Sequence, residues 1–146
     1  RALLLSTLDR AFAAAERGHR LAVVIFEPDA PDRDDGSALR SLAALVSRFT
    51  RRMDLAGRVG QSRLLAILTS CNADGAAIYA DRILAAFATQ DGSRTASAGI
   101  AGYVPGMAGP QALLAAAEDA LARARAAGGG RVGRPSVAEA ESAAVG

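Results

Sequence analysis

The unbroken apolar run Leu21–Phe26 limits the possible folds of this chain more than any other stretch. Successive side chains of a strand point to opposite faces of a sheet, so a run of this kind is apolar on both faces. It therefore predicts a buried central strand, which ends at Glu27-Pro28-Asp29. The next segment, residues 30–36, is acidic and rich in turn residues. We expect a solvated loop there rather than a metal cage formed by its carboxylates.

Amphipathic helices are predicted before and after this strand. Residues 1–17 have apolar positions at the three-and-four spacing of a helix, which ends at Gly18-His19-Arg20, where His19 is expected to be solvated. Ser37 or Asp35 can cap the second helix, which runs for roughly four turns. The expected inward positions are Leu5, Leu8, Phe12 and Ala15 in the first helix and Leu39, Leu42, Leu45 or Val46, Phe49 and Met53 in the second.

A β-hairpin is predicted next, with strands Leu55–Val59 and Arg63–Leu68 on either side of the polar turn Gly60-Gln61-Ser62. A third helix follows Asp74-Gly75. Its expected apolar stripe comprises Tyr79, Ile83 and Phe87.

The last part of the sequence predicts another strand and another helix. Ser93–Tyr103 alternates apolar and small polar residues, as a strand does. Pro110, a residue that favours helix starts, opens a helix over Gln111–Ala127, and Gly128-Gly129-Gly130 stops it. Arg131-Val132 is expected to add a short strand. The inward positions of the last helix are Leu113 or Leu114, Ala117, Leu121 and Ala124.

The predicted order of elements is α-β-α-β-β-α-β-α-β. Its inner βαββαβ unit is typical of a ferredoxin-like α+β fold, an antiparallel sheet with helices on one or both faces. We expect one such domain over residues 1–132. Residues 133–146 are small and polar without periodicity, and we expect a disordered tail there.

Composition excludes several classes of protein. No apolar run approaches the length of a membrane span, and the single Cys71 rules out an internal disulfide framework and gives no support to a zinc cluster. A cytoplasmic, reducing setting is expected, and any membrane anchor of the full-length protein would lie in segments outside this one. The basic residues are all arginine apart from His19 and are scattered, at a net charge of +2, so no nucleic-acid surface is expected.

The stretch Arg51–Leu68 resembles the GGDEF family, the bacterial diguanylate cyclases, around their signature hairpin. The signature turn of that family falls on Gly60-Gln61-Ser62-Arg63-Leu64, where only the first glycine is kept. The resemblance implies a nucleotidyl-cyclase-like fold, an antiparallel sheet flanked by helices, over nearly all of residues 1–132. Further stretches that resemble the family are Leu21–Asp29, Ser97-Ala98-Gly99-Ile100-Ala101 and Ala117–Val132.

The resemblance also implies that the catalytic signature is degenerate. The family joins two GTP molecules with the help of divalent cations, which carboxylates of the first strand and of the signature turn hold. These carboxylates map to Glu27, Ser62 and Arg63, so a hydroxyl and a positive charge replace two acids. Gln61 replaces a turn glycine, and the loop with the guanine-binding residues is shortened, although a basic phosphate residue is kept at Arg125. We therefore expect no catalytic residue and no metal site, hence a pseudo-cyclase and not an enzyme.

An Arg-x-x-Asp motif, formed by Arg51 and Asp54, stands at the family's offset from the signature turn. The resemblance implies that it binds cyclic di-GMP. Arg51 would donate to the O6/N7 edge of a guanine, and Asp54 would accept from its N1–H and N2 amino groups. A second arginine of the family maps to Arg82, where it would contact phosphate or stack on a guanine. The structural alternative is a surface ion pair between Arg51 and Asp54, with Arg82 solvated near Asp81.

These observations predict a non-catalytic cyclic di-GMP receptor that binds the dinucleotide as an intercalated dimer, without metal or other cofactor. It would signal to a partner protein or to upstream segments, or act as a homodimer, in a process such as exopolysaccharide secretion, motility or cell-cycle control. Two alternatives stay open. One is a ligand-free interaction or dimerisation scaffold with the same fold. The other, less favoured, is a residual cyclase that uses Glu27 and a metal.

Overall fold

A computed structural model describes residues 2–30, 36–91 and 94–135 of the chain. Within these ranges the helices and strands follow one another in the predicted order, which confirms the α+β fold. The helices are α1 (Ala2–Glu16), α2 (Ser37–Phe49), α3 (Ala73–Asp91) and α4 (Pro110–Ala126). The strands are β1 (Leu21–Pro28), β2 (Leu55–Val59), β3 (Arg63–Thr69), β4 (Ala96–Gly102) and β5 (Val132–Gly133).

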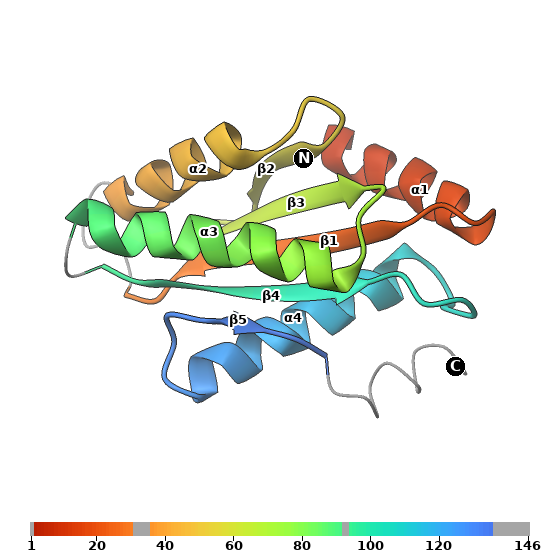
Figure 1. Cartoon of the computed structure of the whole chain (residues 1–146). Coiled ribbons are helices and arrows are strands. Elements are labelled where there is room, and N and C mark those ends of the chain that lie inside the picture. Colours follow the sequence, from red (N-terminus) through yellow and green to blue (C-terminus); the bar gives the residue numbers. More distant parts are fainter. Residues whose placement is uncertain (1, 31–35, 92–93, 136–146) are drawn as a thin grey trace.

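The strands form one sheet in the order β2-β3-β1-β4-β5, with β1 at its centre (Figure 1). β1 is antiparallel to both of its neighbours, so that Val24 lies opposite Ala66 of β3 and opposite Ile100 of β4. β5 runs parallel to β4, and the sheet is therefore antiparallel everywhere except at this edge. All eight residues of β1 are buried, as predicted for a strand that is apolar on both faces.

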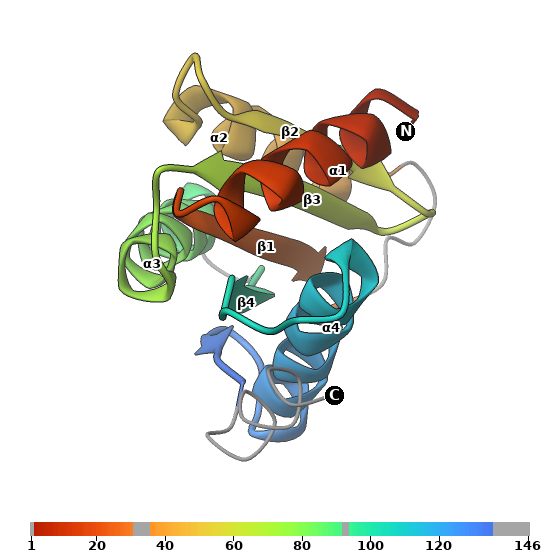
Figure 2. The same ribbon diagram turned by 90° about the vertical axis from the view of Figure 1, so that its right-hand side faces the viewer.

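Each face of the sheet is covered by two helices. α2 and α3 lie on one face, and α1 and α4 lie on the other (Figures 1 and 2). Alternate residues of β1 serve the two layers: Val24 and Phe26 pack beneath α2 and α3, whereas Val23 and Ile25 pack against the core of α1 and α4. The two-residue period of the strand thus builds both hydrophobic layers.

α4 lies close to the sheet because β4 carries a glycine where the helix crosses it. A Cβ atom on Gly99 would overlap the backbone carbonyl oxygen of Ala117 and the backbone of Leu121. Both of these α4 residues are fully buried. A larger residue at position 99 would push α4 away from the sheet, so packing explains this glycine.

Three predicted inward positions are wrong. In α1, Leu4 is buried and Leu5 is 38% exposed, so the apolar stripe begins one residue earlier. α2 ends at Phe49, which is 38% exposed, and Met53 in the following turn is 65% exposed. The helical spacing of apolar residues continues in the sequence past Phe49, but the helix itself ends there and the chain turns toward β2. The confirmed buried positions are Leu8, Phe12, Ala15, Leu39, Leu42, Leu45, Val46, Ile83, Phe87, Leu113, Ala117, Leu121 and Ala124.

The start of α2 also differs from the prediction. Ser37 is the first residue of the helix and not its cap, since Gly36 occupies the cap position in a left-handed conformation with φ of 69°. The Ser37 hydroxyl instead accepts a hydrogen bond from Arg94 Nη2 at 3.0 Å. Asp35, the other candidate cap, and the carboxylates of the acidic loop lie in residues 31–35, outside the described residues.

Further boundaries are shifted. α3 begins at Ala73, so Asp74-Gly75 lies inside the helix and not before it. β4 begins at Ala96, and Ser93, where the strand was predicted to start, lies outside the described residues. β5 includes Gly133, the first residue of the expected tail, while residues 136–146 of that tail are not described. Within the described ranges no helix has the length and hydropathy needed to cross a membrane.

Candidate functional site

A groove of about 1100 Å³ lies between α2 and the β2–β3 hairpin. One end of it lies at the hairpin turn, near Glu27 and Ser62, and the other lies beyond α2, near Arg51 and Asp54. Its charged lining is mostly cationic, which favours anionic ligands. The charged lining residues are Arg40, Arg51, Arg52, Arg58, Arg125, Glu27 and Asp54.

At the turn end, the Glu27 carboxylate is held by three side chains. Ser62 Oγ donates to Oε2 at 2.7 Å, Arg63 Nε donates to the same oxygen at 3.3 Å, and Arg125 Nη1 donates to Oε1. The Glu27 side chain is only 11% exposed, whereas the two arginines are partly solvated. Two guanidinium groups therefore neutralise the one acid that could serve as the family's metal ligand.

The neighbouring carboxylate, Asp29, is also used inside the protein. It accepts hydrogen bonds from Ser97 Oγ at 2.6 Å, Thr95 Oγ1 at 2.7 Å and the backbone N–H of Gly130 at 2.8 Å. These contacts join the end of β1 to β4 and to the glycine turn after α4.

This donor set does not fit a divalent cation. Mg²⁺ and Mn²⁺ need unpaired carboxylate oxygens, yet Glu27 and Asp29 already accept several hydrogen bonds each. Among the described residues, no three His, Cys, Asp or Glu side chains are grouped as metal ligands would be. Arg63, at an acidic position of the family's turn, also lies 3.5 Å from Glu118 through Nη1, which fixes a positive charge there.

The hairpin turn is closed by an arginine. Arg58 donates from Nε to the carbonyl oxygen of Gly60 at 3.1 Å and from Nη2 to that of Gln61 at 2.6 Å. Gly60 has a φ of 75°, a conformation that glycine adopts without strain. The turn therefore keeps its hairpin shape, while Gln61 and Ser62 put polar side chains at the groove.

At the other end, the structure brings Arg51 and Asp54 together. Arg51 Nε donates to Asp54 Oδ2 at 3.1 Å, and Arg51 Nη2 donates to the carbonyl oxygen of Thr69 at 3.1 Å. Asp54 Oδ1 accepts from both the backbone N–H of Thr69, at 2.9 Å, and its Oγ1, at 3.0 Å. The side chain of Arg51 is 56% exposed and that of Asp54 only 2%. The motif is thus an exposed arginine on a buried carboxylate whose two oxygens both accept hydrogen bonds within the protein.

Tyr79 of α3 contacts Thr50, the residue just before Arg51. Its hydroxyl lies 2.7 Å from Thr50 Oγ1, which in turn donates to the backbone carbonyl of Val46. The ring packs edge-on against Phe26, with the centroids 6.0 Å apart. Burial is the main reason that the pKa of Tyr79 rises from 10.0 to about 12, so the hydroxyl stays protonated and can bridge α3 to the end of α2.

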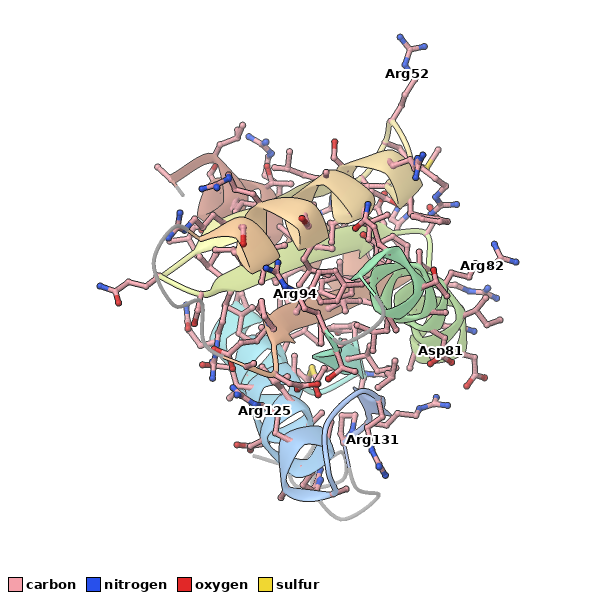
Figure 3. All side chains as sticks on the ribbon, turned by 90° about the vertical axis from the view of Figure 1, so that its left-hand side faces the viewer. Arg52, Asp81, Arg82, Arg94, Arg125 and Arg131 are labelled. Atoms are coloured by element: carbon pink, nitrogen blue, oxygen red, sulfur yellow. The ribbon has the colours of Figure 1, made fainter. Side chains whose placement is uncertain are left out.

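Arg82 is exposed on α3, about one turn beyond Tyr79. It extends away from the ribbon into solvent, as Arg52 does from the turn after α2 (Figure 3). Arg82 is not in contact with Arg51 or Asp54 among the interactions of the described residues. Any joint role of the three would therefore require a ligand that spans them.

Sequence reasoning missed Thr69 and Tyr79. Thr69 is the last residue of an otherwise apolar strand, and a hydroxyl at that position was an available signal. Tyr79 was predicted as part of an apolar stripe, but its ring is half-buried and its hydroxyl carries the contact to Thr50.

The sequence and the fold of this chain are both similar to those of known proteins. The family model described as diguanylate cyclase, GGDEF domain, matches residues 36–131, more than half of the chain. No curated protein sequence is a significant match.

Solved structures share the fold over nearly the whole chain. The active GGEEF domain of a diguanylate cyclase from Vibrio cholerae has a TM-score of 0.85 and 23% identity, covering 93% of this chain and 96% of that one. The GGDEF domain of PA1120 (YfiN or TpbB) from Pseudomonas aeruginosa has a TM-score of 0.81 and 27% identity, over 94% and 96%. That of DgcB from Caulobacter crescentus, in complex with c-di-GMP, has a TM-score of 0.79 and 20% identity, over 92% and 89%. The chain belongs to the GGDEF domain family.

Proposed function

We propose that this domain is a non-catalytic receptor for cyclic di-GMP, with Arg51, Asp54 and Arg82 as its ligand-binding residues. The observation that carries the proposal is the exposed guanidinium of Arg51, held in one orientation by Asp54 and Thr69 beside a cationic groove. GGDEF domains similar to this one have been solved with cyclic di-GMP, among them that of DgcB. The receptor acts in the cytoplasm and signals to a partner or to upstream segments, in a process such as exopolysaccharide secretion, motility or cell-cycle control.

The recognition chemistry follows from arginine's donors. A guanidinium that presents two parallel N–H groups matches the O6/N7 edge of a guanine, the commonest specific arginine–base contact. Arg82 supplies a second cation for a phosphate, or a planar group on which a guanine stacks. Two intercalated dinucleotides offer enough guanines and phosphates to span Arg51 on one element and Arg82 on another.

The contacts at the turn end of the groove support the proposal that the domain is not an enzyme. A cyclase needs carboxylates for cations that offset phosphate charge. Here Glu27 is neutralised by Arg63 and Arg125, and Ser62 offers only a neutral hydroxyl. Incubation with GTP and Mg²⁺ or Mn²⁺ is expected to give no cyclic di-GMP, and product formation would overturn this part of the proposal.

Titration calorimetry with cyclic di-GMP tests the ligand directly. We expect saturable binding by the wild-type domain and a loss of at least about tenfold in affinity for Arg51→Ala, since a bidentate base contact is worth roughly 1–3 kcal/mol. Arg10→Ala is the matched control, because it removes an exposed arginine from α1 on the opposite face of the sheet. Equal losses in both variants would indicate a general charge effect and would refute the site.

A ligand-free interaction scaffold is the second candidate. Met53 is 65% exposed and Ile78 is 55% exposed, and large apolar side chains at such positions favour a protein contact. Among similar structures, the diguanylate cyclase SiaD has been solved in complex with its activator SiaC. A scaffold of this kind, whether a homodimer or a complex with a partner protein, predicts no binding of cyclic di-GMP.

A further inference from the structure

We infer that the outer edge of β2 binds an extended peptide segment of a partner protein, which adds to the sheet as a further strand in the groove beside α2. The peptide carries an apolar side chain and, two residues away, an aspartate or glutamate. This inference does not depend on the proposed function, since it uses β2 and α2 and not Arg51, Asp54 or Arg82.

The first argument is that β2 is an edge strand long enough to pair. The strand order leaves two edges, of which β5 is two residues long and β2 is five. In an antiparallel pair every second residue turns its N–H and C=O groups away from the partner strand, so β2 offers such groups on the side opposite β3. Among the described residues, the backbone hydrogen bonds outside helices and strands include none from Leu55–Val59. An extended peptide satisfies these groups as a neighbouring strand does.

The second argument is that the groove follows this edge. Figure 2 shows β2 at the end of the sheet, with α2 on one side and α1 on the other. Gly57 faces α1, because a Cβ atom there would lie 2.9 Å from Leu4 Cδ1. Its neighbours Ala56 and Arg58 therefore face α2, since successive side chains of a strand alternate between the two faces. The wall of the groove on α2 comprises Leu39, Arg40, Ala43, Val46 and Ser47.

The third argument is that the two groove-facing residues of β2 differ in character. Ala56 packs against the same core as Ala43 and Val46 of α2, so a side chain added beside it meets apolar surface. Arg58 is exposed and, among the described residues, pairs with no carboxylate, because its printed donors go to backbone carbonyl oxygens of the turn. Residues side by side on adjacent strands share a face. An apolar residue beside Ala56 therefore places an acid beside Arg58.

The charge of the groove selects the occupant. Its charged lining comprises five arginines and two acids, and both acids, Glu27 and Asp54, already bind arginines. A second copy of β2 on this edge would bring another set of arginines into a cationic groove, and like charges oppose such pairing. An acidic peptide is attracted by the same charge. A nucleotide matches the charge but not the alternating backbone donors and acceptors of the edge.

Selection on the intact domain from a display library of random peptides of about ten residues tests this inference. We expect the enriched peptides to share an apolar residue two positions from an acid. The best-enriched peptide is then N-methylated at one residue at a time, and its affinity is measured by fluorescence anisotropy. Because only alternate N–H groups of an added strand point to β2, we expect a loss of about fivefold to tenfold at every second position and little change between them.

Two results of this experiment would overturn the inference. A library that enriches no peptide would show that Arg58 only protects a bare edge from pairing. Enriched peptides without an acid, or an N-methyl scan without the two-residue alternation, would show that the domain binds peptides by another mode.

Arg58→Gln locates the peptide on the domain. The variant removes the cation but keeps an amide donor for the turn, and we expect an affinity about three- to tenfold lower for the acidic peptide. Replacing the acid of the peptide by its amide should weaken binding to the wild type by a similar factor and binding to Arg58→Gln hardly at all. Arg10→Gln, on α1 across the sheet, is the matched control and should bind as the wild type does.

Equal losses in Arg58→Gln and Arg10→Gln, or losses that simply add when the domain and the peptide are both changed, would contradict the placement beside Arg58. The amide-substituted peptide is also measured on the unaltered domain, so the charge requirement is tested even where Arg58→Gln destabilises the turn.

Discussion

At the scale of single residues, two carboxylates stand out because both are buried and both are bound by side chains of the protein itself. Glu27 is 11% exposed and takes its partners from the hairpin turn and α4, while Asp54 is 2% exposed and takes its partners from Arg51 and Thr69. A buried carboxylate without such donors would be strongly destabilising. Each acid therefore holds arginine side chains that remain partly solvated: Glu27 holds Arg63 and Arg125, and Asp54 holds Arg51.

Tyr79→Phe should remove the contact to Thr50 while keeping the ring against Phe26. We expect the free energy of unfolding at neutral pH to fall by about 1 kcal/mol, the usual net value of a hydrogen bond. Urea denaturation measures it. A change below a few tenths of a kcal/mol would show that the hydroxyl contact adds nothing to stability.

Tyr79 should also make the free energy of unfolding of the wild type depend on pH in the alkaline range. Its pKa is 10.0 in the unfolded chain and about 12 when folded, so between these values the unfolded chain loses the proton first. Stability is thus full below pH 10 and falls as pH rises toward 12, by up to about 1.4 kcal/mol per pH unit. Urea titrations across this range should show a smaller slope in Tyr79→Phe. Equal slopes in both proteins would contradict the burial of an ionisable hydroxyl.

At the scale of elements, the hairpin turn lies at a junction of β1, β3 and α4. Glu27 at the end of β1 joins the start of β3 through Arg63 and joins α4 through Arg125, and Arg58 of β2 closes the turn between the strands. The hairpin is therefore tied to the end of β1 and to α4 by internal ion pairs.

Glu27→Gln should loosen this junction. The substitution keeps the side-chain shape but removes the carboxylate that pairs with Arg125, and it leaves Arg63 only its exposed partner Glu118. Because both arginines are nearly 40% exposed, solvent screens part of the cost, and we expect a loss of about 1–2 kcal/mol in the free energy of unfolding. Glu118→Gln, whose side chain is 54% exposed, is the matched control and should change stability by less than about 0.5 kcal/mol. If the two variants behave alike in urea, the junction is no stronger than a surface ion pair.

The sequence predicted the elements better than their ends. The helical spacing of Leu8 and Phe12 and the unbroken apolar run of β1 are patterns that extend over a whole element. The structure confirms both, since these residues are buried. Met53 was misplaced because its spacing from α2 continues after the helix has ended, and helix ends depend on tertiary contacts.

For the site, the motif predicted the pairing of Arg51 with Asp54 but not its partners. Thr69 lies fifteen residues beyond Asp54 in the chain and reaches it only through the hairpin register, which no local pattern encodes. The same holds for Tyr79 of α3 and Thr50, which follows α2, because they are 29 residues apart in the chain and are brought together by the tertiary structure.

At the scale of the whole molecule, the proposed ligand spans two helices that share one hydrophobic core and are also joined by the contact between Tyr79 and Thr50. Arg51 follows α2 and Arg82 lies on α3, both on the helical layer of one face (Figure 1). A ligand that binds the folded domain and not the unfolded chain raises its stability by mass action.

Cyclic di-GMP at one hundred times its dissociation constant should therefore add about 2.7 kcal/mol and raise the melting temperature by several degrees. GTP with Mg²⁺ should give a much smaller shift, because the carboxylate that would hold the cation, that of Glu27, is bound to two arginines. Differential scanning fluorimetry compares the two, with Arg51→Ala as the control that should lose the first shift. A shift with GTP and none with cyclic di-GMP would point to the turn end of the groove, near Glu27 and Ser62, and away from Arg51.

The most direct test of a receptor role is the calorimetric titration of the wild-type domain with cyclic di-GMP. The account predicts a saturable heat that reaches about two dinucleotides per chain, as an intercalated dimer requires. A titration with no heat beyond dilution, on protein that melts cooperatively, would contradict it and leave the scaffold as the function of this fold.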